Sequence, residues 1–528
     1  MDGKSIDGEI PKYRALYLSS LKNKEYSMIQ TNDLFEEFIH KFNSYKDIEI
    51  TFSKQENKIL RDYQKTGVKW LYQIHKCDFG GILADEMGLG KSIQLMIFIK
   101  KIIEEDQNSK FLIVVPTSLM YNWDREFQKF DLGLSYEIVA GSKKIRESLI
   151  NKNTNIYITS YGLLREDIDL YQEKTFEVCI LDEAQNIKNP KTGITKCTKK
   201  INAKTKLALT GTPIENSMLE LWSIFDFIMP GFLASEIKFN QKYKIKNFDE
   251  EENMLLERLN HQIAPFILRR KKKDVIKDLP DKIENNIYID LTEKEKKLYL
   301  ASLKEAKEKM DKMILEEGFQ KSKFVILQLL TKLRQLCIDP RIVYDNIQEK
   351  SSKLENLIKV IQEVTEHGHK VLLFTSFRSA LDLVEREFRN EKITSYRIDG
   401  SVPSKQRMEL VEKFNHDDTN VFLIMLKSGG TGLNLTSADI VIHLDLWWNP
   451  QAESQATDRA HRIGQKNVVE VIKLITKGTI EEKILELQNK KKILSDKLIE
   501  GEDRDQNLLS ILSEKEIRNL LSYENNEE

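Results

Sequence analysis

Cysteine is scarce in this chain, and the cysteines present form no motif. Cys77, Cys179, Cys197 and Cys337 are far apart, and no two make a C-x-x-C pair. A structural zinc site or a redox couple needs closely spaced thiols. We therefore interpret the four cysteines as reduced, mostly buried thiols, with a metal site or redox couple as the weaker alternative.

Long apolar runs are also absent. No stretch approaches the roughly 18 apolar residues of a transmembrane helix, and the first residues, MDGKSIDGEI, contain no apolar signal core. Neither an internal repeat of solenoid period nor a low-complexity tract is present. We expect a cytoplasmic, nucleoid-associated protein without a membrane partner.

An excess of one charge is missing as well, because the formal net charge is -1. That value does not exclude nucleic acid, since a near-neutral total can hide a local basic surface. The length of 528 residues suits two or three domains, and 40% hydrophobic with 31% charged residues is typical of a soluble globular protein.

The pattern along the chain predicts an α/β fold class. Short β-branched runs alternate with helical patterns in two regions, which is typical of parallel sheets flanked by helices. The expected buried strands are FLIVVP (111–116), NIYITS (155–160), FEVCILDE (176–183), KLALTGT (206–212), VLLFTS (371–376), TSYRIDG (394–400), VFLIML (421–426) and DIVIHLD (439–445).

Between the two regions the strand signals fade, and a long helical stretch begins with a capping box from Thr292 to Glu295. We expect an N-terminal region (1–55), which looks like a remnant of a larger accessory domain. A first lobe (56–230), a helical insertion (231–350), a second lobe (351–480) and a C-terminal helical segment (481–528) follow.

The first chemical signal is ILADEMGLGKS, from Ile82 to Ser92. It fits the phosphate-binding pattern G-x-x-x-x-G-K-[ST], except that Asp85 stands in place of the first glycine. Lys91 would reach the β- and γ-phosphates of a nucleotide, and the Ser92 hydroxyl would bind Mg²⁺. The backbone around the phosphates would come from Asp85, Glu86, Met87, Gly88, Leu89 and Gly90.

A second signal is LDEAQ, which ends a buried strand about ninety residues downstream. Asp182 would hold Mg²⁺, partly through water, and Glu183 would orient and deprotonate the attacking water. A solvated acidic strand end is the alternative. Two further candidates accompany the pair: Thr210 and Thr212 in LTGTPIEN could sense the γ-phosphate or simply form a turn, and the Gln64 amide could bind adenine.

In the second lobe, NPQAESQATDRAHRIGQ places Arg459 and Arg462 three residues apart, which predicts one shared helix face. Two guanidinium groups with one orientation suit a γ-phosphate reached across a cleft, whereas a plain surface pair is the alternative. The glycine-rich loop of LKSGGTGLNLTSAD precedes them.

This ordered series resembles the superfamily-two helicases and, among them, the Swi/Snf-type DNA translocases. The strings that carry the resemblance, between about Ile59 and Val469, are LRDYQ, DEMGLGKS, VVPTSLMYNW, ITSYGLL, LDEAQNIKNP, LTGTPIEN, LFTSF, RIDGS, SGGTGLNL, HLDLWWNP and QATDRAHRIGQ.

The resemblance implies two RecA-like lobes, ATP and Mg²⁺ as cofactors, and double-stranded DNA as partner. It implies that Gly429, Gly430 and Thr431 lie near DNA or nucleotide and couple the lobes, and that Gln455 faces the cleft. It also implies that Pro116, Thr117, Trp123 and the Thr159–Tyr161 turn lie near a DNA strand. Gln185 departs from the histidine of many relatives, and its position suggests that it lies just beyond the catalytic pair's reach.

We therefore expect a monomeric ATP hydrolase that moves along duplex DNA and remodels protein–DNA complexes, with an unidentified protein target. A strand-separating DNA or RNA helicase is the alternative, and an inactive ATP-binding scaffold is disfavoured by the intact motif residues. The basic stretch in ILRRKKKDVIKDLP (267–280) could be a solvated linker face, a phosphate contact or hinge, or a localisation signal. Trp447 and Trp448 could stack on bases, but packing is the better interpretation because a duplex offers no free bases.

Overall fold

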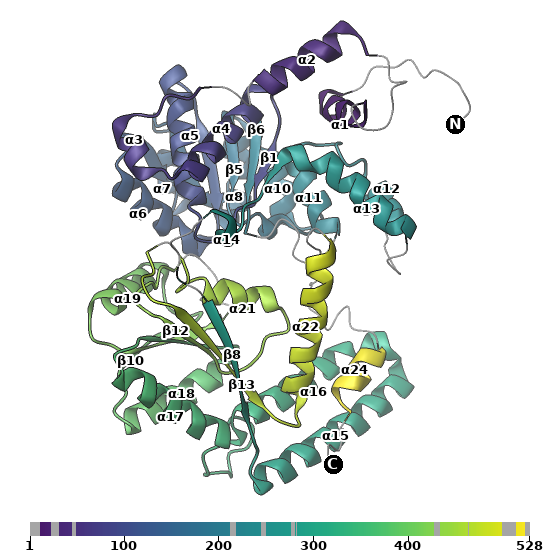
Figure 1. The fold of residues 1–528 in the computed structure, drawn as a ribbon, viewed down its shortest axis with the longest axis vertical. Coiled ribbons are helices and arrows are strands. Elements are labelled where there is room, and N and C mark those ends of the chain that lie inside the picture. The colour runs from purple at the N-terminus through teal and green to yellow at the C-terminus, as the bar shows by residue number, and fades with distance from the viewer. Residues whose placement is uncertain are drawn as a thin grey trace. The chain divides into compact units, whose positions relative to one another are not determined.

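The protein forms two compact units, Met1–Val275 and Ile276–Glu528, each built on its own parallel sheet (Figure 1). The computed structural model describes residues 11–22, 31–44, 49–211, 218–243, 250–275, 280, 282–426, 433–462, 464–498 and 514–522. Within these ranges, no helix is both long and apolar enough to cross a membrane.

The N-terminal unit contains a seven-stranded parallel sheet. The four strands that the sequence predicts here form its contiguous centre, β4-β2-β5-β6. In order across the sheet, the strands are β3 (Tyr136–Ile138), β4 (Ile156–Ser160), β2 (Phe111–Val115), β5 (Thr175–Leu181), β6 (Asn202–Leu209), β1 (Gly81–Leu83) and β7 (Ile267–Leu268). Because all strands run parallel, the loops after β1, β5 and β6 leave the sheet at one edge.

Helices connect these strands and flank the sheet (Figure 1). α5 begins directly after the glycine-rich loop and buries apolar side chains almost all round, and it packs against α4 and α6. The helices of this unit are α1 (Lys12–Lys22), α2 (Asp33–Ser44), α3 (Lys54–Ile59), α4 (Asp62–Lys76), α5 (Lys91–Glu105), α6 (Met120–Phe130), α7 (Lys143–Ile150), α8 (Tyr161–Glu166), α9 (Ile168–Gln172), α10 (Gly193–Lys199), α11 (Met218–Ile228), α12 (Glu236–Lys242), α13 (Glu250–Ile263) and α14 (Lys272–Val275).

The C-terminal unit contains a six-stranded parallel sheet. Again the four predicted strands are contiguous, as β10-β11-β9-β12. The order across the sheet is β10 (Ser395–Ile398), β11 (Val421–Met425), β9 (Val371–Thr375), β12 (Ile440–His443), β13 (Val469–Thr476) and β8 (Lys282–Ile289). The α/β fold class is therefore confirmed in both units.

The predicted capping box is present at the start of the longest helix of this unit. The Thr292 side chain accepts from the Glu295 backbone N–H, and the Glu295 side chain accepts from the Thr292 backbone N–H. The helices are α15 (Glu293–Glu317), α16 (Phe319–Ile338), α17 (Ser352–Glu366), α18 (Arg378–Asn390), α19 (Ser404–His416), α21 (Pro450–Thr457), α22 (Ile480–Leu498) and α24 (Glu514–Leu520).

The segment expected to be a helical insertion, 231–350, also contributes one strand to each sheet. β7 pairs with β1 in the N-terminal unit, and β8 pairs with β13 in the C-terminal unit. β7 is only two residues long, and β8 is mostly exposed with polar residues such as Glu284 and Asn285. Neither presents the apolar run that predicts most of the eight expected strands, and β1, β3 and β13 are not among the expected strands either. The domain boundaries stay predictions.

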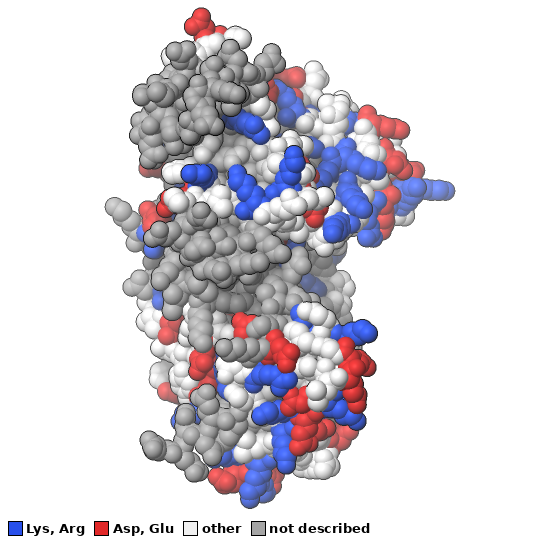
Figure 2. Space-filling view, turned by 90° about the vertical axis from the view of Figure 1, so that its right-hand side faces the viewer, with Lys and Arg blue, Asp and Glu red and all other residues white. Residues whose placement is uncertain are grey.

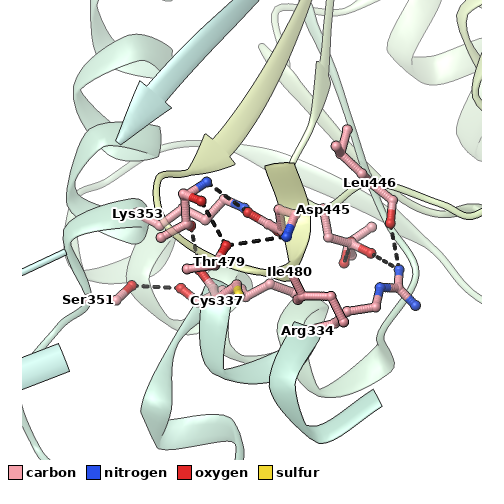
Figure 3. Close-up of polar contacts among 12 residues, drawn as sticks. Arg334, Cys337, Ser351, Lys353, Asp445, Leu446, Thr479 and Ile480 are labelled. Carbon is pink, nitrogen blue, oxygen red and sulfur yellow. Dashed lines mark hydrogen bonds and ion pairs between the residues drawn. The ribbon is translucent and has the colours of Figure 1, made fainter. Parts of the chain in front are cut away.

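Two buried ion pairs connect segments of the C-terminal unit (Figure 3): Lys353 with Glu481 joins α17 to α22, and Arg334 with Asp445 joins α16 to the loop after β12. The Lys353 ammonium, on α17, donates to both carboxylate oxygens of Glu481 at 2.7 Å, and both side chains are 1% exposed. Arg334, on α16, donates to Asp445 at 2.8 Å and to the Leu446 carbonyl at 2.7 Å.

The Arg334 guanidinium also lies over the rings of Trp447 and Trp448, 5.2 and 5.4 Å from their centroids. Trp448 is buried in the core formed by α15, α16 and α22. The packing interpretation of the two tryptophans is confirmed, and stacking on bases is excluded for Trp448.

We predict that Lys353→Ala lowers the free energy of unfolding of the C-terminal unit by about 3–5 kcal/mol, because it leaves the Glu481 carboxylate buried without its partner. The double variant Lys353→Met/Glu481→Leu should recover most of that loss. Urea unfolding measures both values. As a control, Lys294→Ala breaks a pair with Glu349 whose side chains are 79% and 70% exposed, and its effect should stay below about 1 kcal/mol.

Candidate active site

The glycine-rich loop between β1 and α5 has the backbone that a phosphate-binding loop needs. Gly88 and Gly90 have φ values of 87° and 74°, in the left-handed region that favours glycine. Gly90 also lies against Gln64, so close that a Cβ at Gly90 would be 2.5 Å from the Gln64 amide nitrogen. Lys91 is the first residue of α5, close to the predicted start at Ser92. The helix N-terminus therefore follows the loop directly, as anion binding requires.

Several side chains donate hydrogen bonds to backbone carbonyls of this loop. The Lys91 ammonium donates to the Asp85 carbonyl at 2.7 Å. Gln64, which is buried, and Tyr63 both donate to the Leu89 carbonyl at 3.0 Å. Gln64 thus supports the loop itself, and its contact with adenine stays a prediction.

Asp85, the departure from the phosphate-loop pattern, is fully buried and paired with Arg270. The Arg270 Nε donates to Asp85 Oδ1 at 2.9 Å, Nη2 donates to Oδ2, and Gln94 donates to Oδ2 at 3.1 Å. Arg270 belongs to the basic stretch whose role the sequence left open. The Arg270 side chain is 12% exposed and paired with a buried carboxylate, and Lys272 is buried, so for these two residues the solvated linker face is wrong.

The acidic pair follows β5. Asp182 Oδ2 accepts from Trp123 Nε1 at 2.8 Å, and Oδ1 accepts from the Glu183 backbone N–H at 2.9 Å. Removal from bulk water, together with repulsion from Glu183, raises the pKa of Asp182 to about 7, while Trp123 and Lys91 act in the opposite direction. A carboxylate with so little compensating positive charge favours a cation beside it.

Gln185 contacts the proposed catalytic base directly. Its amide nitrogen donates to Glu183 Oε2 at 2.8 Å, and its amide oxygen accepts from the Thr210 hydroxyl at 3.3 Å. The expectation that Gln185 lies beyond the reach of the catalytic pair is therefore wrong. Glu183 has a left-handed φ of 50° and is followed by a 3₁₀ turn, Ala184–Ile187, which brings Gln185 back to it. Thr210 is thereby connected to Glu183, whereas Thr212 lies outside the described residues.

In the C-terminal unit, α21 ends at Thr457. Arg459 and Arg462 lie in the tight turns that follow, where the Arg459 N–H donates to the Ala456 carbonyl and the Arg462 N–H to the Ala460 carbonyl. The expectation of one shared helix face is wrong, because these short-range bonds replace the helical ones.

Arg459 is buried, and its carbonyl accepts from the Leu435 N–H at 3.1 Å, which ties the turn to the chain after the glycine-rich loop. Arg462 donates to the Leu433 carbonyl at 3.5 Å. Gln455 is half-buried on α21. Gly429, Gly430 and Thr431 lie outside the described residues.

Two aromatic side chains reach Asp182 from segments that the resemblance places along DNA. Trp123, on α6, is 1% exposed and bonds the Asp182 carboxylate. Tyr161, the first residue of α8, is buried and donates to the Asp182 carbonyl at 2.8 Å. Burial and the nearby carboxylates raise the pKa of Tyr161 well above its usual value, so it remains a donor. Thr117, by contrast, is exposed at the end of β2.

The structure thus adds Arg270, Gln94, Trp123 and Tyr161 to the residues around the two motifs. The resemblance places Trp123 and Tyr161 near DNA and the basic stretch leaves the role of Arg270 open, so neither predicts the contacts with Asp182 and Asp85. Each of these side chains reaches its motif through a hydrogen bond from its polar end, and sequence pattern does not predict such a bond.

Comparison with known proteins matches the same regions. The SNF2-related domain model matches residues 63–342, and the helicase conserved C-terminal domain model matches residues 350–464. An uncharacterized ATP-dependent helicase of Mycoplasma pneumoniae is 39% identical over 98% of this chain and 49% of its own length. The ISWI chromatin-remodeling complex ATPase ISW1 of Saccharomyces cerevisiae is 34% identical over 82% of this chain and 40% of its own length.

A solved structure of the Sulfolobus solfataricus SWI2/SNF2 ATPase core in complex with dsDNA is 36% identical, covering 88% of this chain and 97% of that one, with a TM-score of 0.43. The chain spans about half the length of the M. pneumoniae relative. The SNF2-related model alone covers more than half of the chain. With its two parallel sheets and the loops that follow their strands, the chain belongs to the SNF2-related family of helicase-like, ATP-dependent enzymes.

Proposed function

We propose that this chain hydrolyses ATP on double-stranded DNA, moves along the duplex and so remodels protein–DNA complexes. The observation that carries the proposal is the double attachment of Asp182 to Trp123 and Tyr161. Both residues belong to segments that the family resemblance places along a DNA strand. A DNA strand bound there would act on α6 and α8 and therefore on the position of the Asp182 carboxylate. Hydrolysis would then depend on DNA.

Residues of the N-terminal unit have separate roles in hydrolysis. Lys91 neutralises the β- and γ-phosphates while the loop N–H groups surround them. Glu183 orients the attacking water and accepts its proton. Gln185 orients the Glu183 carboxylate through the 2.8 Å bond. It also accepts a hydrogen bond from Thr210, the first residue after β6, and so links Thr210 to the base. From the C-terminal unit, Arg459 and Arg462 would stabilise charge on the γ-phosphate in the transition state.

The residues present fit Mg²⁺. Hard oxygen donors suit this ion, which keeps several waters and binds few protein groups besides the nucleotide phosphates. The Ser92 hydroxyl and the Asp182 carboxylate would hold it, with the cation offsetting the raised pKa of Asp182. When bound, Mg²⁺ neutralises phosphate charge and orients the γ-phosphoryl group.

The charge distribution supports a polyanionic partner in spite of the net charge of -1. On the face shown in Figure 2, Lys and Arg side chains gather over part of the N-terminal unit, whereas the C-terminal unit mixes both signs. Contacts to phosphates carry no sequence information, so binding should tolerate any duplex sequence and weaken steeply with salt.

We predict that duplex DNA stimulates ATP hydrolysis and that the duplex is not unwound. Steady-state ATPase rates with duplex, single-stranded DNA and RNA measure the first part, at two salt concentrations. Displacement of a third strand from a triplex reports translocation, and opening of a forked duplex reports unwinding.

Triplex displacement that requires ATP, with intact forks, would support the proposal. Efficient fork opening without triplex displacement would instead support the strand-separating helicase. ATP binding without any nucleic-acid-stimulated turnover would indicate a scaffold. The Glu183→Gln variant serves as the negative control in each assay, because it should bind DNA without turnover.

A further inference from the structure

The start of the phosphate loop is held by a network that the general phosphate-loop pattern does not contain. Where that pattern has glycine, this chain has Asp85, which is 0% exposed. Arg270 grips the Asp85 carboxylate with two nitrogens, Nε at 2.9 Å and Nη2. Arg270 also donates to Gln94 Oε1 at 2.6 Å and to the Tyr63 carbonyl, and its guanidinium lies 5.2 Å from the centre of the Tyr63 ring.

The backbone beside Arg270 follows the loop. The Ala84 N–H donates to the Leu268 carbonyl at 2.7 Å, and the Glu86 N–H donates to the Arg270 carbonyl at 3.0 Å. The Lys272 N–H in turn donates to the Glu86 carboxylate at 2.7 Å. β7 and the residues after it therefore extend the sheet alongside the loop, from Ala84 to Glu86.

The charge at Asp85 matters for phosphate binding. A buried carboxylate at the base of a loop that receives a polyanion repels it, and the backbone carbonyl of the same residue accepts from the Lys91 ammonium at 2.7 Å. Arg270 cancels that charge with a two-pronged contact of the kind that guanidinium makes with carboxylate. Gln94, on the first turns of α5, then fixes the same carboxylate relative to the helix N-terminus.

We propose that Arg270 is a positioning residue for nucleotide binding: by neutralising and orienting Asp85, it removes the repulsion between that carboxylate and the phosphates and sets the first turn of the loop. This inference rests on the assignment of residues 85–92 to phosphate binding. It explains how the chain tolerates Asp85 where the general pattern has glycine. It also makes ATP affinity depend on the segment just before Val275, where the N-terminal unit ends.

The test is ATP affinity of the full chain, measured with a fluorescent ATP analogue in the absence of DNA. Arg270→Ala should weaken binding about 10- to 100-fold, the range typical of partners that orient metal ligands. Arg270→Lys should have an intermediate affinity, because the positive charge stays but the second hydrogen bond to Asp85 is lost. Asp85→Asn breaks the same contact yet removes the negative charge, so its loss of affinity should be clearly smaller than that of Arg270→Ala.

The double variant Arg270→Ala/Asp85→Asn should regain most of the affinity that Arg270→Ala loses. A purely structural pair predicts the opposite, namely similar losses from either single variant and no recovery in the double. The matched control is Arg146→Ala, which breaks another buried pair of the same unit, Arg146 with Asp167 at 2.9 Å, away from the loop. It should lower the unfolding temperature without changing the affinity for the analogue.

Lys91→Ala distinguishes a failure of the phosphate-loop assignment from a failure of the role of Arg270. Unchanged affinity in Lys91→Ala would overturn the assignment of the loop itself. Weakened affinity in Lys91→Ala, with equal effects of Arg270→Ala and Asp85→Asn or with no recovery in the double variant, would overturn only the role of Arg270. Thermal unfolding of each variant shows whether the chain is folded where affinity is measured.

Discussion

Glu183→Gln should abolish ATP turnover while leaving ATP binding intact. The amide keeps the size of the carboxylate and its place beside Gln185, but it cannot accept the proton of the attacking water. General-base catalysis contributes typically about 10²–10⁴ in rate, or roughly 3–5 kcal/mol of transition-state stabilisation at 1.36 kcal/mol per decade. Steady-state hydrolysis and single-turnover assays, together with analogue affinity, measure the two effects separately.

Gln185→Ala is the graded companion of this variant. It leaves the base in place but removes the 2.8 Å bond that orients it and the connection to Thr210. Turnover should fall by less than in Glu183→Gln, mainly through kcat. Near-normal turnover in Glu183→Gln would rule out Glu183 as the base, whatever Gln185→Ala does.

Arg462→Ala should remove nearly all DNA-stimulated turnover and leave ATP and DNA binding close to normal. In the proposed mechanism Lys91 and Glu183 act from one unit and Arg462 from the other, so turnover would require both units to act on one nucleotide. DNA bound to both units would favour that state, which explains stimulation as a shift of population. An arginine that stabilises transferring phosphate contributes typically about 10³–10⁵ in rate, roughly 4–7 kcal/mol.

The measurement is steady-state ATPase activity with and without duplex, alongside analogue affinity. Arg459→Ala is the comparison: Arg459 is buried, and it should lose stability as well as activity, whereas Arg462 is half-buried. If Arg462→Ala lost ATP affinity and kept its stimulation ratio, Arg462 would be a ground-state binding residue. The dependence on both units would then fail.

Sequence pattern predicted the parts of the fold that have strong local signals. The eight expected strands are all present, and most are apolar runs buried on both faces, as parallel strands are, although β10 (Ser395–Ile398) is buried only at Ile398. The capping box at Thr292 was predicted for the same reason, since its two partners lie three residues apart. β1, β3, β7, β8 and β13 were not predicted. β7 and β8 lack a local apolar pattern and are strands because of partners far along the chain, whereas β13 contains a buried apolar pattern that the prediction did not use.

The candidate site divides in the same way. The phosphate loop and the acidic pair are short, local motifs, and β1 and β5 carry them to one edge of the sheet. The bond of Gln185 to Glu183 depends on a left-handed residue within the motif, which side-chain spacing alone does not predict. Arg270 lies far from Asp85 in the sequence, so a charge in a basic stretch gave no sign of its buried partner. α21 ends at Thr457 because tight turns follow it, and the three-residue spacing of Arg459 and Arg462 does not reveal those turns.

The place of β8 in the C-terminal sheet has a consequence for the order in which the protein is made. Among the described strands of its unit, β8 (Lys282–Ile289) is the first to leave the ribosome, and its partner β13 (Val469–Thr476) is the last. The N-terminal unit can complete its sheet once β7 has been synthesised. The C-terminal sheet must wait for nearly two hundred further residues, as the bond from the Lys477 N–H to the Ile289 carbonyl illustrates. Pairing across such a separation is slow, so a nascent chain would hold one finished unit while the edge of β12 still lacks a neighbour.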